Sequence, residues 1–247
     1  KYRHPIEKRG DQQLRQKLVN RIKPFILRRL KTDVAKELPE KTTIEVNIDM
    51  NDQQSKLYEA VRATMQENIQ KIVAEKGFKR SQIQILDALL KLRQVCCHPS
   101  LLKLDSVKTG QAHSAKLEQL MDMVVPMVEE GRKILIFSQF TSMLELIEQQ
   151  LHHAEIGYVK LTGKTKKRDE VITAFQSGQV PVFLISLKAG GVGLNLTAAD
   201  TVIHYDPWWN PAAEDQASDR AWRIGQDKPV FVLSLIHISE PTRLGMI

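Results

Sequence analysis

Residues 133–137 are Lys-Ile-Leu-Ile-Phe, an almost unbroken apolar run that ends at Ser138 and Gln139. Such a run is typical of a β-strand that is covered on both faces, as in a parallel sheet. Further short runs of this kind follow along the chain, at residues 158–161, 180–185, 201–205 and 230–235. Helical patterns lie before and between them, at residues 115–130, 142–153, 167–177 and 212–222. This alternation predicts an α/β fold, with a parallel sheet and crossover helices over residues 114–236.

The region before this lobe has a different pattern. Residues 42–48 alternate apolar and polar side chains, which predicts a half-buried strand. Asn51 is a suitable cap for a helix whose apolar residues recur at every fourth position up to Gly77. A second helix is expected at residues 81–97, and the polar residues 106–114 are expected to form a linker. We therefore predict an N-terminal helical extension to the α/β lobe.

The charge of the chain favours an anionic partner. Its 247 residues contain 36 Lys and Arg against 29 Asp and Glu, which gives a net charge of +7. The excess of positive charge is concentrated in residues 1–36. A basic segment of this kind can bind nucleic acid, but charge blocks are also common on solvated helix surfaces. Composition alone leaves both interpretations open.

The cysteines and the hydropathy argue against several classes of protein. Cys96 and Cys97 are adjacent, so they provide neither a disulfide framework nor a Cys-x-x-Cys zinc site. We therefore expect a reducing, intracellular compartment and no metal site. No stretch approaches the roughly 20 apolar residues of a membrane span, and the chain does not start with a signal-like segment. We expect no membrane partner.

A glycine-rich turn follows the strand expected at residues 180–185. Its sequence is Ser186-Leu-Lys-Ala-Gly-Gly-Val-Gly-Leu-Asn-Leu-Thr197. Glycine permits left-handed backbone conformations and lets backbone N–H groups approach an anion. The alternative interpretation is a tight turn between a strand and a helix.

Two arginines and a glutamine follow at helical spacing. If residues 212–222 are helical, Gln216, Arg220 and Arg223 lie at i, i+4 and i+7 on one face. One amide and two guanidiniums beside a flexible backbone suit a polyphosphate ligand. The alternative is a surface helix whose arginines extend into solvent.

The usual nucleotide-binding signatures are missing from this sequence. Gly163-Lys164-Thr165 is not a Walker-type loop, because Tyr158 stands where that loop needs a glycine. The glycine-rich turn fails the dinucleotide pattern, because the third glycine position is Leu196. No Asp-Glu-x-His motif follows a strand. The sequence lacks the parts that hold a triphosphate, magnesium and attacking water, so we expect this chain alone to be inactive as an ATPase.

Several segments resemble motifs of the Swi/Snf-type ATPases, a group of superfamily-two DNA translocases. They occur in the family's order and extend from about residue 2 to residue 235. The matching segments are residues 25–34, Leu38-Pro39, residues 92–99, 133–139, 161–168 and 186–197, and the long motif from Asp206 to Gln226. The resemblance implies a P-loop NTPase-like fold, namely the second RecA-like lobe of such a motor.

The resemblance also implies a division of the chain. Residues 1–49 would finish a first ATPase lobe and form a basic connector, and residues 50–110 would form a helical protrusion and linker. Residues 111–236 would be the RecA-like helicase C-terminal lobe. Residues 237–247 depart from the family pattern, and we expect them to be a foreign or frame-shifted tail.

On the nucleotide side, the resemblance implies a catalytic role for Arg220, Arg223 and Gln216. The two arginines would act as arginine fingers toward the γ-phosphate of ATP. Asn195 would lie toward the nucleotide ribose, and Gly191 and Gly193 would belong to the same cofactor-binding turn. ATP and Mg²⁺ would be held mainly by a first lobe that precedes Lys1.

On the DNA side, the resemblance implies contacts to backbone phosphates that do not read the bases. They would come from Ser138, Gln139, Thr162, Lys164, Arg168, Ser186 and Lys188. We expect affinity for DNA with little sequence preference and a steep dependence on salt. The chain has Trp222 where the family commonly has histidine.

The function implied by the resemblance is the C-terminal half of an ATP-dependent translocase on double-stranded DNA that remodels protein–DNA complexes. Expected partners are the duplex backbone, a first ATPase lobe in the same full-length chain and a DNA-bound protein complex. The expected location is a bacterial cytoplasm or nucleoid, or a eukaryotic nucleus. Two alternatives stay open: an RNA-dependent helicase lobe, against which the Trp-Asn pair of the long motif argues, and a non-catalytic basic DNA-binding module.

Overall fold

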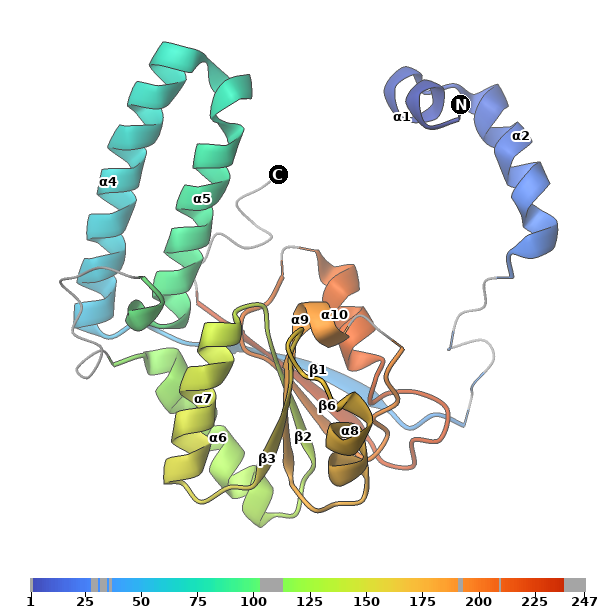
Figure 1. The fold of residues 1–247 in the computed structure, drawn as a ribbon, viewed down its shortest axis with the longest axis vertical. Helices are drawn as coiled ribbons and strands as arrows, with labels where there is room; N and C mark the ends of the chain where they lie inside the picture. The colour runs from blue at the N-terminus through green and yellow to red at the C-terminus, as the bar shows by residue number, and fades with distance from the viewer. Residues whose placement is uncertain are drawn as a thin grey trace. The chain divides into compact units, whose positions relative to one another are not determined.

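The computed structural model describes residues 2–27, 31, 35, 37–102, 113–190, 193–208 and 210–237. The chain divides into two compact units, Lys1–Leu38 and Pro39–Ile247, and Figure 1 shows the fold of each. The smaller unit contains the helices α1 (Arg3–Arg9) and α2 (Gln12–Ile22) and the 3-10 helix η1 (Lys23–Phe25). Asp11 caps α2, because its side chain accepts a hydrogen bond from the backbone N–H of Leu14 at 2.9 Å.

A sheet of six parallel strands forms the centre of the larger unit, in the order β1-β6-β5-β2-β4-β3. The strands are β1 (Lys41–Asn47), β2 (Ile134–Ser138), β3 (Tyr158–Leu161), β4 (Val182–Ser186), β5 (Thr201–His204) and β6 (Val230–Ile236). Each of them lies within a residue or two of an expected strand. The prediction of an α/β fold with a parallel sheet is therefore confirmed.

Strand β1 corrects the expected division of the chain. Every residue of β1 is paired with β6, from Lys41 opposite Val230 to Asn47 opposite Ile236. Ile48, directly after β1, is buried in the core of the larger unit. A strand belongs to the sheet that satisfies its backbone hydrogen bonds. The boundary between the two units along the chain therefore lies after Leu38. The expected division at residue 49 is wrong for this strand, because β1 belongs to the larger unit.

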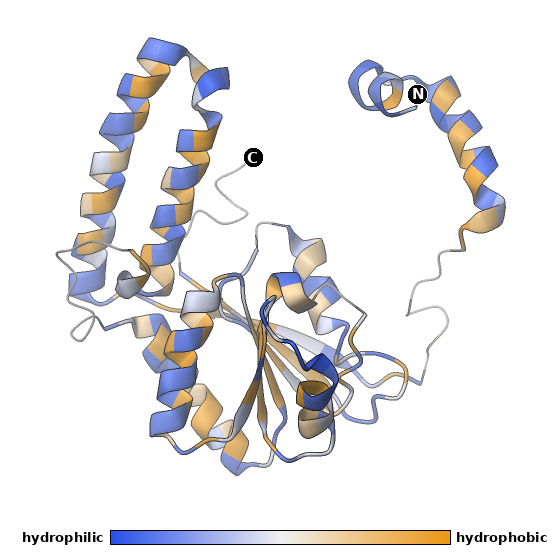
Figure 2. Cartoon of the chain, viewed as in Figure 1, coloured by the Kyte–Doolittle hydropathy of each residue, from blue (hydrophilic) through white to orange (hydrophobic). Residues whose placement is uncertain are grey.

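Helices cover both faces of the sheet, as Figure 1 shows. On one face lie α6 (Ala115–Glu129) and α7 (Thr141–His153), and on the other lie α8 (Arg168–Gln176) and α10 (Pro211–Ser218). Alternate residues of a strand point to opposite faces. Ile134 and Ile136 of β2 accordingly pack with α6 and α7, and Leu135 and Phe137 pack with α8 and α10. The apolar colouring of the central strands in Figure 2 reflects this two-sided burial.

The two helices expected upstream form a hairpin in which they lie side by side (Figure 1). They are α4 (Asp52–Lys76) and α5 (Phe78–Cys97), and the short 3-10 helix η2 (Pro99–Leu101) follows. Asn51 caps α4 as predicted, because its side chain accepts the backbone N–H of Gln54 at 2.8 Å. Gly77 joins the two helices with a φ of +73°, a left-handed conformation that glycine adopts without strain.

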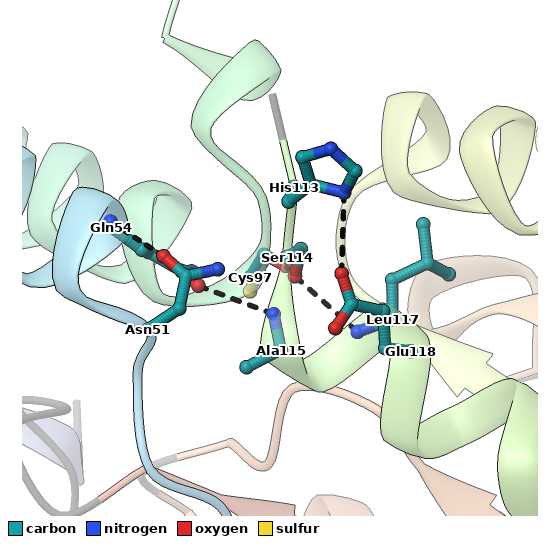
Figure 3. A network of polar contacts seen from close by, with 8 residues as sticks. All are labelled: Asn51, Gln54, Cys97, His113, Ser114, Ala115, Leu117 and Glu118. Carbon is teal, nitrogen blue, oxygen red and sulfur yellow. Dashed lines mark hydrogen bonds and ion pairs between the residues drawn. The ribbon is translucent and has the colours of Figure 1, made fainter. Parts of the chain in front are cut away.

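Buried hydrogen bonds join the base of this hairpin to α6 (Figure 3). The side chain of Gln54 donates from Nε2 to the carbonyl of Val95 at 2.7 Å, and its Oε1 accepts the N–H of Ala115 at 3.3 Å. The hydroxyl of Ser114 donates to the carbonyl of Cys97 at 2.7 Å. Separating the hairpin from α6 would leave the N–H of Ala115 and the hydroxyl of Ser114 without these partners, which is costly. The hairpin therefore packs as a fixed part of the larger unit.

His98 follows the last residue of α5 and caps the start of η2. Its Nδ1 accepts the backbone N–H of Ser100 at 3.1 Å, and its side chain is buried. Burial, together with the nearby His113, lowers the pKa of His98 from 6.5 to about 4. The imidazole is therefore neutral at neutral pH.

Candidate functional site

The residues expected to bind phosphates lie where the strands end, along one edge of the sheet that we call the carboxyl edge. Ser138 is the last residue of β2 and Ser186 the last residue of β4, and the two are paired in the sheet. Thr162 follows β3, and Lys188 lies in the short helix α9 (Leu187–Gly190) after β4. Ligands of open α/β sheets bind at this edge. The fold thus brings together polar residues that are far apart in the sequence.

Two side chains at the carboxyl edge have buried donors without a hydrogen-bond partner among the described residues. Gln139 follows β2, and the unpaired donor is its Nε2. Arg168 begins α8 and donates from Nη2 to the carbonyl of Ala189 at 3.0 Å, while its Nε is unpaired. Buried donors are almost always hydrogen-bonded in proteins. Both side chains are therefore suited to an anionic ligand.

Thr162 and Lys164 lie in a tight turn after β3. The N–H of Lys164 donates to the hydroxyl of Thr162 at 3.2 Å, and the N–H of Thr162 donates to the hydroxyl of Thr165 at 3.0 Å. A hydroxyl that accepts one hydrogen bond can still donate another, and the side chain of Lys164 is exposed. The turn therefore presents a hydroxyl and an ammonium group.

The glycine-rich turn is described only in part. Gly191 lies outside the described residues, whereas Gly193 and Asn195 are exposed. An added Cβ at Gly193 would meet no heavy atom within 4 Å, and its φ lies outside the left-handed range. The conformational freedom of glycine is therefore not used at Gly193. Asn195 is held through its backbone, because its carbonyl accepts Nε2 of Gln176 at 2.9 Å.

The helix that carries Gln216 is shorter than predicted. It ends at Ser218, so Arg220 and Arg223 lie in the turns that follow. The hydroxyl of Ser218 donates back to the carbonyl of Glu214 at 3.0 Å, and such side-chain bonding to the preceding turn competes with regular helix. Gln216 itself is exposed on α10. The prediction that all three side chains share one helical face is therefore wrong.

The two arginines still lie close enough to affect each other. Arg220 is 8% exposed, and its Nε has no hydrogen-bond partner among the described residues. Burial and the positive charge of Arg223 lower the pKa of Arg220, whereas Asp219 raises it. Two guanidiniums therefore repel each other where little water can screen them. A bound anion would relieve this repulsion.

Both arginines are hydrogen-bonded to the second half of the glycine-rich turn. The N–H of Leu196 donates to the carbonyl of Arg220 at 3.0 Å. Nη1 of Arg223 donates to the carbonyl of Leu194 at 3.3 Å. The glycine-rich turn and the arginine pair, which the sequence suggested separately, thus form one hydrogen-bonded assembly.

Sequence reasoning assigned no role to two residues of this region. Asp206 is a buried carboxylate that follows β5, and a charged residue at the end of an apolar strand was the available signal. Trp222 donates from Nε1 to the carbonyl of Pro39 at 2.8 Å, and its departure from the family pattern was the signal there. Asp206 accepts the backbone N–H of Gln139, and Trp222 bonds to Pro39. Neither of these bonds could be read from the sequence, because each joins residues that are distant along the chain.

The part of the chain that the structure describes contains neither a metal-binding cluster nor a membrane-spanning helix. No three side chains of His, Cys, Asp or Glu come together there in a group able to hold a metal ion. No helix there has both the length and the apolar character required to traverse a bilayer.

Two family descriptions match this chain. Residues 1–101 match the SNF2-related domain. Residues 115–225 match the helicase conserved C-terminal domain. The second match extends from α6 to the turns after α10, so it includes the carboxyl edge and both arginines.

Individual relatives cover most of the chain. An ATP-dependent helicase of Mycoplasma genitalium is 38% identical over 234 residues, which are 94% of this chain and 22% of that protein. The C-terminal domain of the Sulfolobus solfataricus SWI2/SNF2 ATPase is 34% identical with a TM-score of 0.63, and the match covers 81% of this chain and 80% of that one. The ATPase core from the same organism, solved in complex with double-stranded DNA, is 36% identical with a TM-score of 0.67, and the match covers 93% and 48%. The chain spans about a fifth to a quarter of the length of the curated relatives it matches.

Proposed function

The chain belongs to the SWI2/SNF2 family of ATPases, and from this premise we propose that it supplies the C-terminal lobe of an ATP-dependent translocase on double-stranded DNA. The observation that carries the proposal is the arginine pair. Arg220 is buried beside the charge of Arg223 and has an unpaired Nε donor. Such a pair favours the binding of an anion, and ATP is the polyphosphate on which this family of enzymes acts.

In this proposal Arg220 and Arg223 act as arginine fingers on ATP held between two lobes. Negative charge develops on the γ-phosphate oxygens during phosphoryl transfer, and a planar guanidinium can donate two parallel hydrogen bonds to such oxygens. One arginine finger contributes about 10³–10⁵-fold to turnover in other systems. Further contacts from this lobe are proposed for Gln216, Gly191, Gly193 and Asn195.

The rest of the nucleotide site is proposed to lie in a first lobe. That lobe would hold most of the triphosphate, Mg²⁺ and the attacking water, because the present sequence contains neither a Walker-type loop nor an Asp-Glu-x-His motif. The 247-residue chain by itself is therefore expected to show no ATP turnover. The two lobes would be parts of one longer polypeptide.

The carboxyl edge is proposed to hold the DNA backbone. Its phosphate contacts would be Ser138, Gln139, Thr162, Lys164, Arg168, Ser186 and Lys188. The unpaired donors Gln139 Nε2 and Arg168 Nε support this assignment, because a phosphate oxygen would satisfy them. Contacts of this kind position a duplex without reading its bases.

Movement would follow from alternating contact with the duplex. ATP would draw the two lobes together through the arginine fingers, and hydrolysis would release them. If each lobe holds one strand of the duplex in turn, the protein advances along the DNA. We propose that the result is displacement or remodelling of DNA-bound proteins rather than separation of the strands.

Nucleic-acid stimulation of ATP turnover tests this proposal. In the complete protein, duplex DNA should raise the ATP turnover rate more than single-stranded RNA does. The complete protein should also displace a protein bound to duplex DNA when ATP is supplied, while the strands stay paired. Stronger stimulation by RNA would favour an RNA-dependent helicase lobe. DNA binding without any ATP turnover would favour a non-catalytic DNA-binding module.

A further inference from the structure

Asp206 connects two neighbouring strands at the carboxyl edge. It follows β5 and is 2% exposed. Its two carboxylate oxygens accept the backbone N–H of Gln139, at 3.1 and 3.3 Å. Gln139 follows β2, whose pairing with β5 ends at Phe137 and His204. The carboxylate therefore extends the contact between the two strands into the turn beyond the sheet.

The two cationic side chains near Asp206 donate hydrogen bonds to backbone carbonyls of neighbouring segments. Arg93 of α5 donates from Nη2 to the carbonyl of Pro207 at 2.6 Å, and its guanidinium lies 5.2 Å from the ring centroid of Trp208. Lys116 of α6 is buried and donates from Nζ to a carbonyl of β6 at 3.0 Å. The segment that leaves β5 is thus fixed to the helical hairpin on one side, while Asp206 fixes the turn after β2.

Burial makes ionisation of Asp206 unfavourable. It raises the pKa from 3.8 to about 6, against the lowering effects of Ser138, Gln139, Arg93 and Lys116. An acid whose pKa is higher in the folded protein contributes stability below its unfolded pKa, and this contribution is lost as the pH rises through the folded pKa. Above a pH of about 6 the ionised carboxylate therefore destabilises the fold. Residues that lower stability are often retained for function.

We propose that Asp206 is a positioning residue for the contact between this protein and a DNA phosphate. Its carboxylate fixes the backbone of Gln139, so that the turn after β2 presents the Gln139 amide to the phosphate. The Nε2 of Gln139, which has no partner among the described residues, is the donor that would bind the phosphate. The inference rests on the proposed DNA binding and adds a residue that does not touch DNA itself.

The substitution Asp206→Asn in the complete protein tests this role, because it removes the charge with little change in shape. An amide oxygen accepts the N–H of Gln139 but an amide nitrogen does not, so the turn should be held less well. We expect the duplex DNA concentration for half-maximal ATPase stimulation to rise about tenfold. Maximal turnover should stay within about twofold of wild type. The melting temperature at a pH of about 7.5 should stay the same or rise, because the buried charge is gone.

A pH series provides a second readout. The groups that face Asp206 are Arg93 from α5, Lys116 from α6, and Ser138 with the Gln139 N–H from β2 and its turn. In the wild-type protein the half-maximal DNA concentration should rise as the pH falls through about 6, since protonation removes the acceptor charge. The Asp206→Asn variant should lack this rise. Titration of ATP is the same in both proteins, so the difference between them isolates Asp206.

Asp200→Asn is the matched control. Asp200 is a buried carboxylate at the opposite end of β5, where it accepts the hydroxyl of Thr201 at 2.8 Å. This variant should leave the DNA requirement unchanged. The inference is overturned if Asp206→Asn also leaves it unchanged, or if that variant loses melting temperature and maximal turnover together. A wild-type protein that neither binds nor responds to duplex DNA overturns the proposed function, and the inference with it.

Discussion

The indole Nε1 of Trp222 donates a hydrogen bond to the backbone carbonyl of Pro39, over 2.8 Å. Pro39 is the first residue of the larger unit, and Trp222 lies between the two arginines in the sequence. Nζ of Lys41 lies 5.3 Å from the ring centroid of Trp222 and 3.6 Å from a carboxylate oxygen of Asp215. Pro39 and Lys41, at the start of β1, are therefore bound to the segment that carries Arg220 and Arg223.

Replacing Trp222 with phenylalanine should weaken this connection. Phenylalanine keeps an aromatic ring near Lys41 but has no N–H for the carbonyl of Pro39. We expect the free energy of unfolding to fall by about 1 kcal/mol. The maximal ATP turnover of the complete protein should fall about threefold, with an unchanged DNA requirement.

Trp222→His is the matched variant, because it restores a ring N–H and the residue type commonly seen in the family. It should recover part of the lost turnover. If Trp222→Phe turns over ATP at the wild-type rate, the bond to Pro39 has no part in placing the arginines.

Gln54 should be important for the stability of the junction between the hairpin and α6. Leucine in its place would leave the carbonyl of Val95 and the N–H of Ala115 without this partner. We expect Gln54→Leu to lower the free energy of unfolding by about 2–3 kcal/mol, as measured by urea denaturation. Gln53→Leu is the control, because Gln53 is the exposed neighbour in the same helix, and its effect should stay within about 0.5 kcal/mol. Equal effects of the two substitutions would contradict the assigned role.

Lys164 should contribute to DNA affinity through its charge alone. Its side chain is exposed in the turn after β3. Lys164→Ala in the complete protein should weaken duplex binding to a similar degree for different base sequences, and it should reduce the slope of log K against log salt by about 1. Lys91→Ala on α5 is the control, since the ammonium of Lys91 is paired with Asp87 at 2.8 Å. An unchanged salt slope for Lys164→Ala would remove this residue from the DNA contacts.

His98 should make the protein less stable in acid. Burial lowers its pKa from 6.5 to about 4, so the unfolded chain binds the proton more readily. The stability that neutral His98 contributes is present above its unfolded pKa and is lost as the pH falls through the folded value. Between pH values of about 7.5 and 4.5 this loss should be about 2–3 kcal/mol.

The variant His98→Asn isolates this effect, because asparagine can still accept the N–H of Ser100. Its free energy of unfolding should fall less in acid than that of the wild type. Asp206 titrates in the same range but in both proteins, so it does not affect the difference. An identical pH dependence in the two proteins would show that His98 is not the group responsible.

Much of the fold could be predicted from local sequence patterns. The apolar run at Ile134–Ser138 identifies a strand covered on both faces, and the recurrence of apolar residues up to Gly77 identifies α4. The sheet partner of β1 could not be predicted, because its hydrogen bonds are made with β6 near the other end of the chain. The end of α10 was also missed. The hydroxyl of Ser218 bonds back to Glu214 within the helix, but the bond between Leu196 and Arg220 joins the residues after the helix to a distant segment.

The candidate site was predictable to a similar extent. Parallel strands bring their ends to one edge, so Ser138, Ser186 and Thr162 could be expected together without knowing any contact. Burial decides the rest. The unpaired donor of Arg220 and the raised pKa of Asp206 depend on how deeply the folded chain covers each group, and a sequence does not reveal that depth.

The maximal ATP turnover of the complete protein at saturating duplex DNA tests the role of the two arginines most directly. Arg220→Ala and Arg223→Ala should each lower it by at least about 10²-fold while duplex binding is retained. Arg62→Ala is the control, because Arg62 is a half-exposed arginine of α4 that pairs with Glu59 at 2.7 Å, and it should turn over ATP at the wild-type rate. Wild-type turnover in both Arg220→Ala and Arg223→Ala would contradict the assignment of these residues to the ATP phosphates.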